Sequence, residues 1–250
     1  AAFSGDDRYN VDYLLEEVLQ RQPDHVRRFL LKTSILERLS GPLCDAVTAL
    51  PVSQKMLETL ERGNLFIIPL DSKRQWYRYH HLFAEVLQAY ALVELPKEIV
   101  SMHQRASRWY EQNGLFSDAI RHALAAQDFD QAADLIEQVW PAMRNRQQET
   151  TVLGWIKALP ETLIRTRPIL SVAHALVLLN TGQPGQLNAV EGRLLDAARQ
   201  LAQLEPTDEK QYQSLPATIA NTRAFCAQVQ GNFAGAIAYA EQALALLPSV

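Results

Sequence analysis

The sequence predicts a mainly α-helical protein, in which a winged-helix domain with one β-hairpin precedes an α-α superhelix of tetratricopeptide-like repeats. Three observations indicate this class. Apolar residues recur at helical spacing through most of the 250 residues. Runs of β-branched and aromatic residues, which favour strands, gather between residues 65 and 79. After Pro96 the chain becomes rich in alanine and is broken by glycine and proline, as in helical repeats.

The first 62 residues are predicted to form short helices. Ser53 has the residue type of an N-cap, and Gly63 with Asn64 can end the helix that follows it. Gly41 and Pro42 are expected to break the chain between two helices. Apolar spacing and these signals predict helices over residues 9–20, 24–31, 43–50 and 53–62.

A β-hairpin follows these helices. Residues 65–68 and 75–79 are predicted strands, and residues 71–73 supply the turn between them. Helical spacing resumes at His80 and continues until Pro96. The order of three helices, a hairpin and a helix is the winged-helix arrangement, with the hairpin as the wing.

Two segments after Pro96 match the tetratricopeptide pattern of small and aromatic residues. In each, a glycine is expected to end one helix, an aromatic residue to fill the wedge between helices, and alanines to allow close packing. Further breaks are expected at Pro141, Pro160, 182–185 and Pro216, and the glycine spacing fits units of about 39 residues. The matching residues are Gly114, Phe116, Ala119, Ala123 and Ala126, then Gly231, Phe233, Ala236, Ala240, Ala243 and Pro248.

Composition disfavours several classes of protein. A formal net charge of −4 and a pI near 5.9 argue against a surface that binds nucleic acid throughout. Lys73, Arg74 and Arg78 on the wing leave a local basic patch open, although Glu58 and Glu61 in the preceding helix oppose DNA contact. With no secretion signal or membrane-length apolar run, a cytoplasmic location is expected. The start of the sequence without Met suggests a piece of a longer protein.

No motif of an active site is present. The phosphate loop, the dinucleotide fingerprint, the hydrolase nucleophile elbow and the zinc-protease motif are all missing from the sequence. The sequence therefore predicts no catalytic residue, no metal site and no enzyme activity for this chain. Cys44 and Cys226 are expected to be small buried hydrophobic residues.

Most of the tryptophans and histidines are expected to have structural roles. Adjacent His80 and His81 would diverge by about 100° on a helix, which disfavours shared metal binding. Three tryptophans are expected to pack in the core: Trp109, Trp140 and Trp155. Four single histidines are expected either on a helix surface or in the core with their hydrogen bonds satisfied: His25, His103, His122 and His174.

The run from Phe3 through Asp130 resembles the MalT-like ATP-dependent regulators of the LuxR type, which are signal-transduction ATPases with numerous domains. The resemblance is carried by FSGDDRYNVDYLLEEVL, FLLKTSILERLSGPLCDAV, LERGNLFIIPLD, WYRYHHLF and HQRASRWYEQNGLFSDAIRHALAAQDFDQAADLIE. The segment WIKALPETLIRTRPIL extends it to residue 170, and beyond this only the repeat pattern supports it.

The resemblance implies a domain order and a regulatory function. It implies the end of a helical domain in residues 1–28, a winged helix in 29–95, a helical arm in 96–145, and the start of a tetratricopeptide-like sensor in 146–250. The ATPase domain and the C-terminal DNA-binding helix-turn-helix of such regulators are absent from this sequence. ATP or ADP would therefore bind the parent protein. Expected partners are the ATPase domain of the same polypeptide, an inducer or regulatory protein at the repeats, and other copies of the active parent.

His80 is the site residue that the resemblance implies. In related switches, a histidine of a Met-His-Asp-like motif begins the last winged-helix helix and contacts the phosphates of bound ADP. The run from Tyr79 to Phe83 resembles that motif, with His80 at the histidine position and His81 where Asp is usual. Alternatively, both histidines cap the helix and pack on Trp76. A constitutive tetratricopeptide-like scaffold that holds a peptide is the competing hypothesis for the whole chain.

Overall fold

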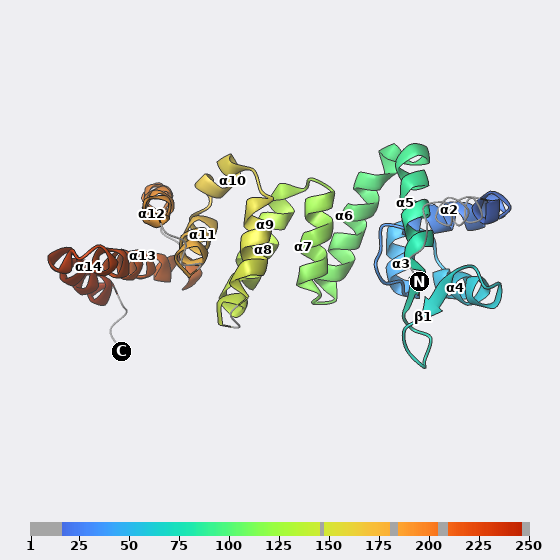
Figure 1. Ribbon diagram of the computed structural model, residues 1–250, viewed down its shortest axis with the longest axis horizontal. Coiled ribbons are helices and arrows are strands. Elements are labelled where there is room, and N and C mark those ends of the chain that lie inside the picture. The colour runs from blue at the N-terminus through green and yellow to red at the C-terminus, as the bar shows by residue number, and fades with distance from the viewer. Residues whose placement is uncertain (1–16, 146–147, 181–184, 205–209, 247–250) are drawn as a thin grey trace, which may run out of the picture. The chain divides into compact units, whose positions relative to one another are not determined.

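The computed structural model describes residues 17–145, 148–180, 185–204 and 210–246 (Figure 1). The chain divides into two compact units, residues 1–128 and 129–250. Most of the helix predicted over residues 9–20 lies outside the described residues, and its described end, residues 17–20, is helical. The described residues are mainly helical with one two-stranded sheet, so the predicted fold class is confirmed.

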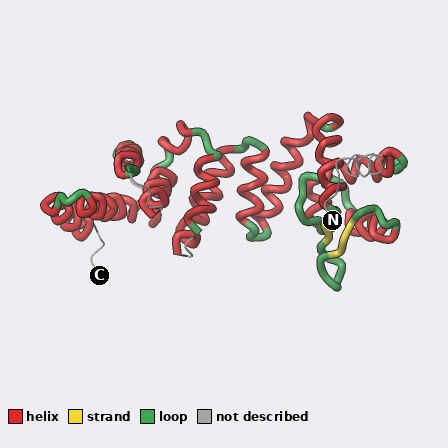
Figure 2. Tube along the Cα trace, in the orientation of Figure 1, coloured by secondary structure: helices red, strands yellow, loops and turns green. Residues whose placement is uncertain are grey.

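Unit 1 has the predicted winged-helix order. Strands β1 and β2 are antiparallel, with Ile67 opposite Tyr79 and Pro69 opposite Tyr77, and they are the yellow segments in Figure 2. Leu39 adds a bridge to the free edge of β2 through two backbone hydrogen bonds of 2.8 Å with Tyr77. The elements are α2 (Asp24–Thr33), α3 (Gly41–Thr48), α4 (Ser53–Arg62), β1 (Ile67–Pro69), β2 (Tyr77–Tyr79), α5 (His81–Glu94), α6 (Pro96–Gln112) and α7 (Phe116–Ala125).

The core of unit 1 holds the wing against the helices. The Tyr79 hydroxyl and the Thr33 hydroxyl are 2.7 Å apart in a buried hydrogen bond that joins β2 to α2. Burial raises the pKa of the Tyr79 hydroxyl, so it stays protonated and neutral. The apolar part of this core includes fully buried Leu30, Leu43, Leu57, Tyr77, Phe83 and Leu87.

Two helix starts differ from the sequence prediction. Gly41 and Pro42 open α3 instead of separating helices, because proline fits the first turn of a helix, where its missing N–H costs little. Ser53 is the first residue of α4 and not its cap; Val52 is the N-cap, with φ 80°, and its side chain makes no cap hydrogen bond. The Asp45 carboxylate caps this helix start instead, because it accepts a hydrogen bond from the Ser53 N–H at 2.8 Å.

Close packing of α3 on α4 predicts that Gly41→Ala destabilises unit 1. A Cβ at this position would lie 2.7 Å from the Gln54 Cβ and 3.2 Å from its Cα, so the helices would have to separate. Overpacking of this kind should lower the free energy of unfolding, measured with urea, by about 1–3 kcal/mol. The matched control is Gly154→Ala in a helix of unit 2, where no atom lies within 4 Å of the new Cβ. That control should be stabilising by about 0.5–1 kcal/mol; equal effects would contradict the prediction.

The described residues of unit 2 form helices joined by short turns and loops. Pro141 and Pro216 lie inside α8 and α13, so the breaks predicted at these prolines are wrong. Packing of these long helices on their neighbours outweighs the lost backbone hydrogen bond. The elements are α8 (Phe129–Asn145), α9 (Glu149–Lys157), α10 (Glu161–Thr166), α11 (Pro168–Asn180), α12 (Leu187–Leu201), α13 (Lys210–Val229) and α14 (Phe233–Ala245).

The two predicted repeat segments form helical hairpins. Gly114 separates α6 from α7 at φ 71°, and Gly231 separates α13 from α14 at φ 75°, a conformation that glycine adopts readily. Phe233 is 67% exposed, so the prediction that it fills an inter-helix wedge is wrong. The tetratricopeptide-like assignment and the proposed domain borders stay predictions; the compact unit that contains the winged helix includes α6 and α7.

Candidate functional site

His80 lies between strand β2 and helix α5, and it is half-buried. It is the N-cap of α5, with non-helical φ and ψ of −59° and 136°, and its imidazole makes no capping hydrogen bond. Its backbone N–H donates to the Phe66 carbonyl at 2.7 Å, and its carbonyl accepts from the Ala84 N–H at 2.9 Å. The backbone is thus held on both sides, while the ring is left to interact with a group that approaches the start of α5.

The start of α5 favours an anion. The first backbone N–H groups of a helix have no partner within the helix, and the helix dipole places partial positive charge there. No acidic residue lies in the first turn of α5, and no side chain caps it. A phosphate at this position would meet backbone donors and an imidazole together.

The His80 and His81 rings lie close together, contrary to the sequence expectation that they diverge. Their centroids are 4.5 Å apart with an interplanar angle of 33°. The expected divergence assumed two helical residues, whereas His80 is extended and only His81 is helical. Among the described residues, no group of three or more His, Cys, Asp or Glu side chains is placed to hold a metal ion.

Phe66 is a site residue that sequence reasoning missed. Its φ is 51°, in the left-handed region, which is a genuine outlier for a bulky side chain. Its carbonyl accepts from the His80 N–H, its ring lies 5.3 Å from that of Phe83, and it is 38% exposed. The residue type carries no signal for this conformation, which is expected of glycine or asparagine.

One of the three basic residues of the wing is paired with an acidic residue. The Arg74 side chain pairs with Glu61 of α4 at 3.0 Å, while Lys73 and Arg78 are exposed. The Asp71 carboxylate accepts from the backbone N–H groups of Gln75 and Trp76 and organises the turn. Arg74 therefore has a structural partner, which weakens the case for a DNA-reading wing.

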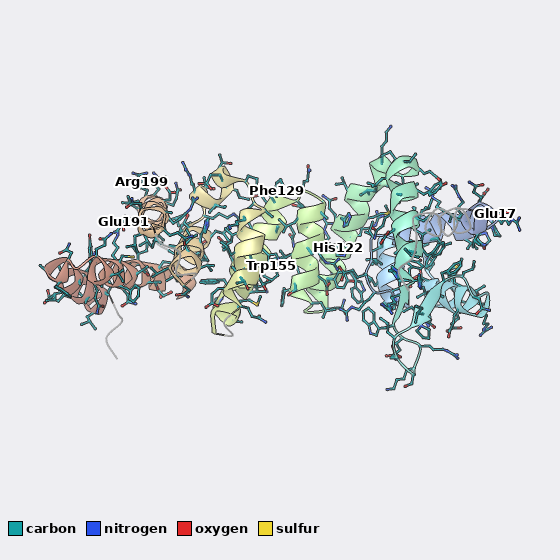
Figure 3. The ribbon with its side chains drawn as sticks, in the orientation of Figure 1. Glu17, His122, Phe129, Trp155, Glu191 and Arg199 are labelled. Atoms are coloured by element: carbon teal, nitrogen blue, oxygen red, sulfur yellow. The ribbon has the colours of Figure 1, made fainter. Side chains whose placement is uncertain are left out.

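His103 of α6 and His122 of α7 form a hydrogen-bonded pair, in which His103 is half-buried and His122 is buried. His122 is labelled in Figure 3. Their Nδ1 atoms are 2.8 Å apart, so one ring must donate and the other accept. His122 is 1% exposed, its ring stacks on Tyr110, and its Nε2 atom has no hydrogen-bond partner. Burial, helped by Arg121 and His103, lowers the pKa of His122 to about 3, and burial also lowers the pKa of His103. Both rings are therefore neutral in the folded state at neutral pH.

Unit 2 contains an ionic cluster at the start of α11, in which Glu137 is buried and Asp130 and Asp134 are exposed. Arg167 pairs with Asp130, Asp134 and Glu137 of α8. Burial raises the pKa of Glu137 to about 7 against the opposing effect of Arg167, and the Oε1 atom of Glu137 has no hydrogen-bond partner. This cluster joins α8 to α11. The ion pair of Arg223 with Glu191, at 2.8 Å, joins α13 to α12; Glu191 is labelled in Figure 3.

Each unit also has an apolar surface that does not include His80. In unit 1, a groove of about 420 Å³ separates α2 from the start of α4. In unit 2, α14 exposes large apolar side chains while Ala243 is its buried residue. The groove is lined by His25, Val26, Phe29, Leu50, Pro51, Val52, Ser53, Lys55, Met56 and Thr59, and the exposed residues of α14 include Phe233, Ile237, Tyr239 and Leu244.

The other sequence predictions have mixed outcomes. Cys44 and Cys226 are buried free thiols, as predicted. Trp140 is buried, whereas Trp109 and Trp155 are half-buried. His174 is buried, but its Nδ1 atom has no partner, so it is not the satisfied core histidine that was expected. Within the described residues, no helix has the length and apolar character needed to cross a membrane.

Comparison with known proteins identifies the region around His80. Residues 15–99 match the model of the MalT winged helix domain. The chain is 30% identical over 210 residues to the HTH-type transcriptional regulator MalT of Cronobacter sakazakii, covering 84% of this chain and 23% of that protein. It is 32% identical over 183 residues to MalT of Klebsiella pneumoniae strain 342, covering 73% of this chain and 20% of that protein.

A protein with a different name also matches. The chain is 34% identical over 187 residues to the serine/threonine-protein kinase PknK of Mycobacterium tuberculosis strain H37Rv, covering 73% of this chain and 17% of that protein. The chain thus spans about a fifth of the length of these relatives. The observed order of helices and strands in the described residues agrees with this match, and the chain therefore contains a winged-helix domain of the MalT family.

Proposed function

We propose that this chain is the regulatory portion of an ATP-dependent transcriptional activator of the LuxR type. The winged helix restrains the ATPase domain of the same polypeptide, and the helical repeats bind an inducer or a regulatory protein that releases the restraint. The observation that carries this proposal is the position of His80, in a MalT-type winged helix, at the uncapped start of α5. The proposed location is the cytoplasm, where ATP and a DNA target are both accessible.

The two kinds of relatives support regulation over catalysis. The matched segment is similar both to proteins named as transcriptional regulators and to one named as a protein kinase. It covers 17% of the kinase and 23% of the regulator from Cronobacter sakazakii. A segment shared by proteins with such different named activities fits a common control module better than either activity.

His80 is proposed to contact the phosphates of ADP in the resting state. His80 is the N-cap of α5, and no side chain caps this helix start, so an imidazole donor and backbone donors are available to the same anion. Such a contact controls a switch only if it exists in one of two states. We place it in the closed state, in which the winged helix lies against the ATPase domain.

The repeats are proposed to bind the activating ligand or protein. Helix α14 carries Glu241 as its charged residue and exposes several large apolar side chains, Phe233 and Ile237 among them. An exposed apolar surface of this kind is a common mark of a protein or ligand contact. In this proposal DNA is bound through a separate helix-turn-helix of the parent protein.

A nucleotide titration tests the proposal. The full-length protein should bind fluorescent N-methylanthraniloyl-ADP, whereas the 250-residue chain should show no micromolar binding. One histidine and a helix start supply few phosphate contacts without a phosphate loop. Fluorescence anisotropy with both proteins at equal concentration is the measurement, and a stable fold of each is checked by circular dichroism.

Each other outcome rejects the proposal in a different way. Micromolar ADP binding by the 250-residue chain would reveal a complete nucleotide site within it. No ADP or ATP binding by the full-length protein would remove nucleotide control altogether. In that case the constitutive scaffold, with its exposed α14 surface, would be the better description.

A further inference from the structure

Trp76 joins the wing to the helical hairpin α6–α7. It directly precedes β2, and its ring lies 6.4 Å from that of Trp109 on α6, in an edge-to-face arrangement of 77°. The Arg38 guanidinium lies 5.2 Å from the centre of the Trp76 ring. The Trp76 ring is therefore in contact with the loop after α2 and with α6.

A second connection links the same hairpin to the same strand. Arg38 also pairs with Asp118 of α7 at 3.3 Å, and Arg121 of α7 pairs with Glu37 at 2.7 Å. Leu39, the next residue along this loop, forms the backbone bridge to β2. Helix α7 thus reaches β2 through residues 37–39, and α6 reaches it through Trp76.

Both connections end next to His80. Strand β2 runs from Tyr77 to Tyr79, and His80 follows it directly. A short strand that is fixed at both edges moves as a unit, so a displacement at Trp76 changes the direction in which the His80 ring leaves the strand. The Phe66 carbonyl then limits how far the His80 backbone can follow.

We propose that Trp109 is a positioning residue for His80: it fixes Trp76 and β2, and thereby makes the phosphate contact of His80 depend on the placement of α6–α7. This inference rests on the proposed function of His80. It adds the route by which the helical arm controls that residue. The proposal assigns the phosphate contact to His80 and not to either tryptophan.

The test is the rate of N-methylanthraniloyl-ADP release from the full-length protein. Loss of an aromatic pair is expected to make Trp109→Ala release the nucleotide about two- to tenfold faster than wild type. Trp109→Phe should release the nucleotide at close to the wild-type rate, because phenylalanine can still make the edge-to-face contact with Trp76. The double variant Trp109→Ala with His80→Ala should be no faster than His80→Ala alone, since Trp109 acts through His80.

The matched control is Arg105→Met, one turn before Trp109 on α6. The Arg105 side chain donates to the Val47 carbonyl of α3 at 2.9 Å, so this change loosens α6 without touching β2. Its release rate should stay within about twofold of wild type, because it removes a hydrogen bond and not the Trp76 contact. An equal acceleration by Arg105→Met would show that general loosening of α6 is sufficient, and would overturn the inference.

A measurement on the chain itself separates the two proposals. Histidine ring signals of the six histidines are followed by ¹H–¹³C correlation spectra and assigned by substitution. Trp109→Ala should shift the His80 signal, and Arg105→Met should not. If His80→Ala speeds release while Trp109→Ala changes neither release nor the His80 signal, the positioning role is wrong and the proposed function stands. If His80→Ala leaves release unchanged, the proposed function fails, and an unshifted His80 signal then rejects the positioning role independently.

Discussion

The full-length protein with His80→Ala is expected to release ADP about five- to 150-fold faster than wild type. This range corresponds to a lost hydrogen bond from the imidazole to a phosphate, worth about 1–3 kcal/mol. Nothing compensates in the open state, in which the winged helix has moved away, so the closed state alone is weakened. The variant should therefore activate transcription without inducer. Stopped-flow release of N-methylanthraniloyl-ADP and RNA sequencing of strains that carry each variant measure the two effects.

His81→Ala is the matched control for this prediction. His81 is the first residue of α5, is exposed, and has its ring 4.5 Å from that of His80. Because the resemblance places the phosphate contact at His80, His81→Ala should change the release rate much less. If His80→Ala folds, releases ADP at the wild-type rate and stays transcriptionally silent, the sensor role is wrong. If both variants accelerate release equally, the paired rings act together and not as one donor.

The sequence predicted the location of His80 because the local signals on both sides are strong. A run of aromatic residues at strand spacing ends at Tyr79, and apolar residues at helical spacing begin immediately afterwards. The structure has a strand and a helix there, with His80 between them. The change of period fixes the junction without any long-range information.

Features that depend on contacts between distant residues could not be predicted in this way. The His103–His122 hydrogen bond joins two helices, and each histidine alone has the pattern of an ordinary helical residue. The left-handed Phe66 and Val52 contradict residue preference, so the surrounding structure imposes their conformations. Pro141 and Pro216 continue helices for the same kind of reason, since packing outweighs the local signal.

The burial of the aromatic residues in the two repeat segments could not be predicted from the sequence pattern either. The sequence pattern treats Gly114 with Phe116 and Gly231 with Phe233 as equivalent, and the helix breaks at both glycines agree. Burial does not follow the pattern, because Phe233 is largely exposed whereas Phe116 is half-buried. A pattern predicts which helices pair, but the partners that cover each pair decide which of its side chains are buried.

Unit 1 is expected to lose stability as the pH falls from about 6.5, because His122 stays neutral when folded. Its pKa falls from 6.5 to about 3 on folding, so the unfolded chain binds the proton first as the solution is acidified. Between these two pKa values the free energy of unfolding therefore falls by about 1.4 kcal/mol for each pH unit of acidification. Above pH 6.5, the pKa of the unfolded state, His122 causes no loss of stability. His103 contributes in the same direction, since burial also lowers its pKa.

The window from pH 6.5 to about 4.5 isolates this effect. Glu98, whose pKa is lowered mainly by its hydrogen bond with Lys32, adds a loss only below its usual value of 4.5. In unit 2, Glu137 acts in the opposite sense: its pKa is raised to about 7, so its contribution is lost as the pH rises through that value. Urea unfolding should therefore be followed with Trp140 and Trp155 replaced by Phe, which leaves Trp76 and Trp109 of unit 1 as reporters.

In this window, His122→Phe should reduce the slope of the free energy of unfolding against pH by about 1 kcal/mol per pH unit. The new ring can still stack on Tyr110, but it takes up no proton and leaves His103 without its partner. Stability at pH 7.5 should therefore fall while its dependence on pH weakens. His25→Gln, at an exposed histidine of the same unit, is the control and should keep the wild-type slope. An unchanged slope in His122→Phe would show that the buried pair does not govern the acid sensitivity of unit 1.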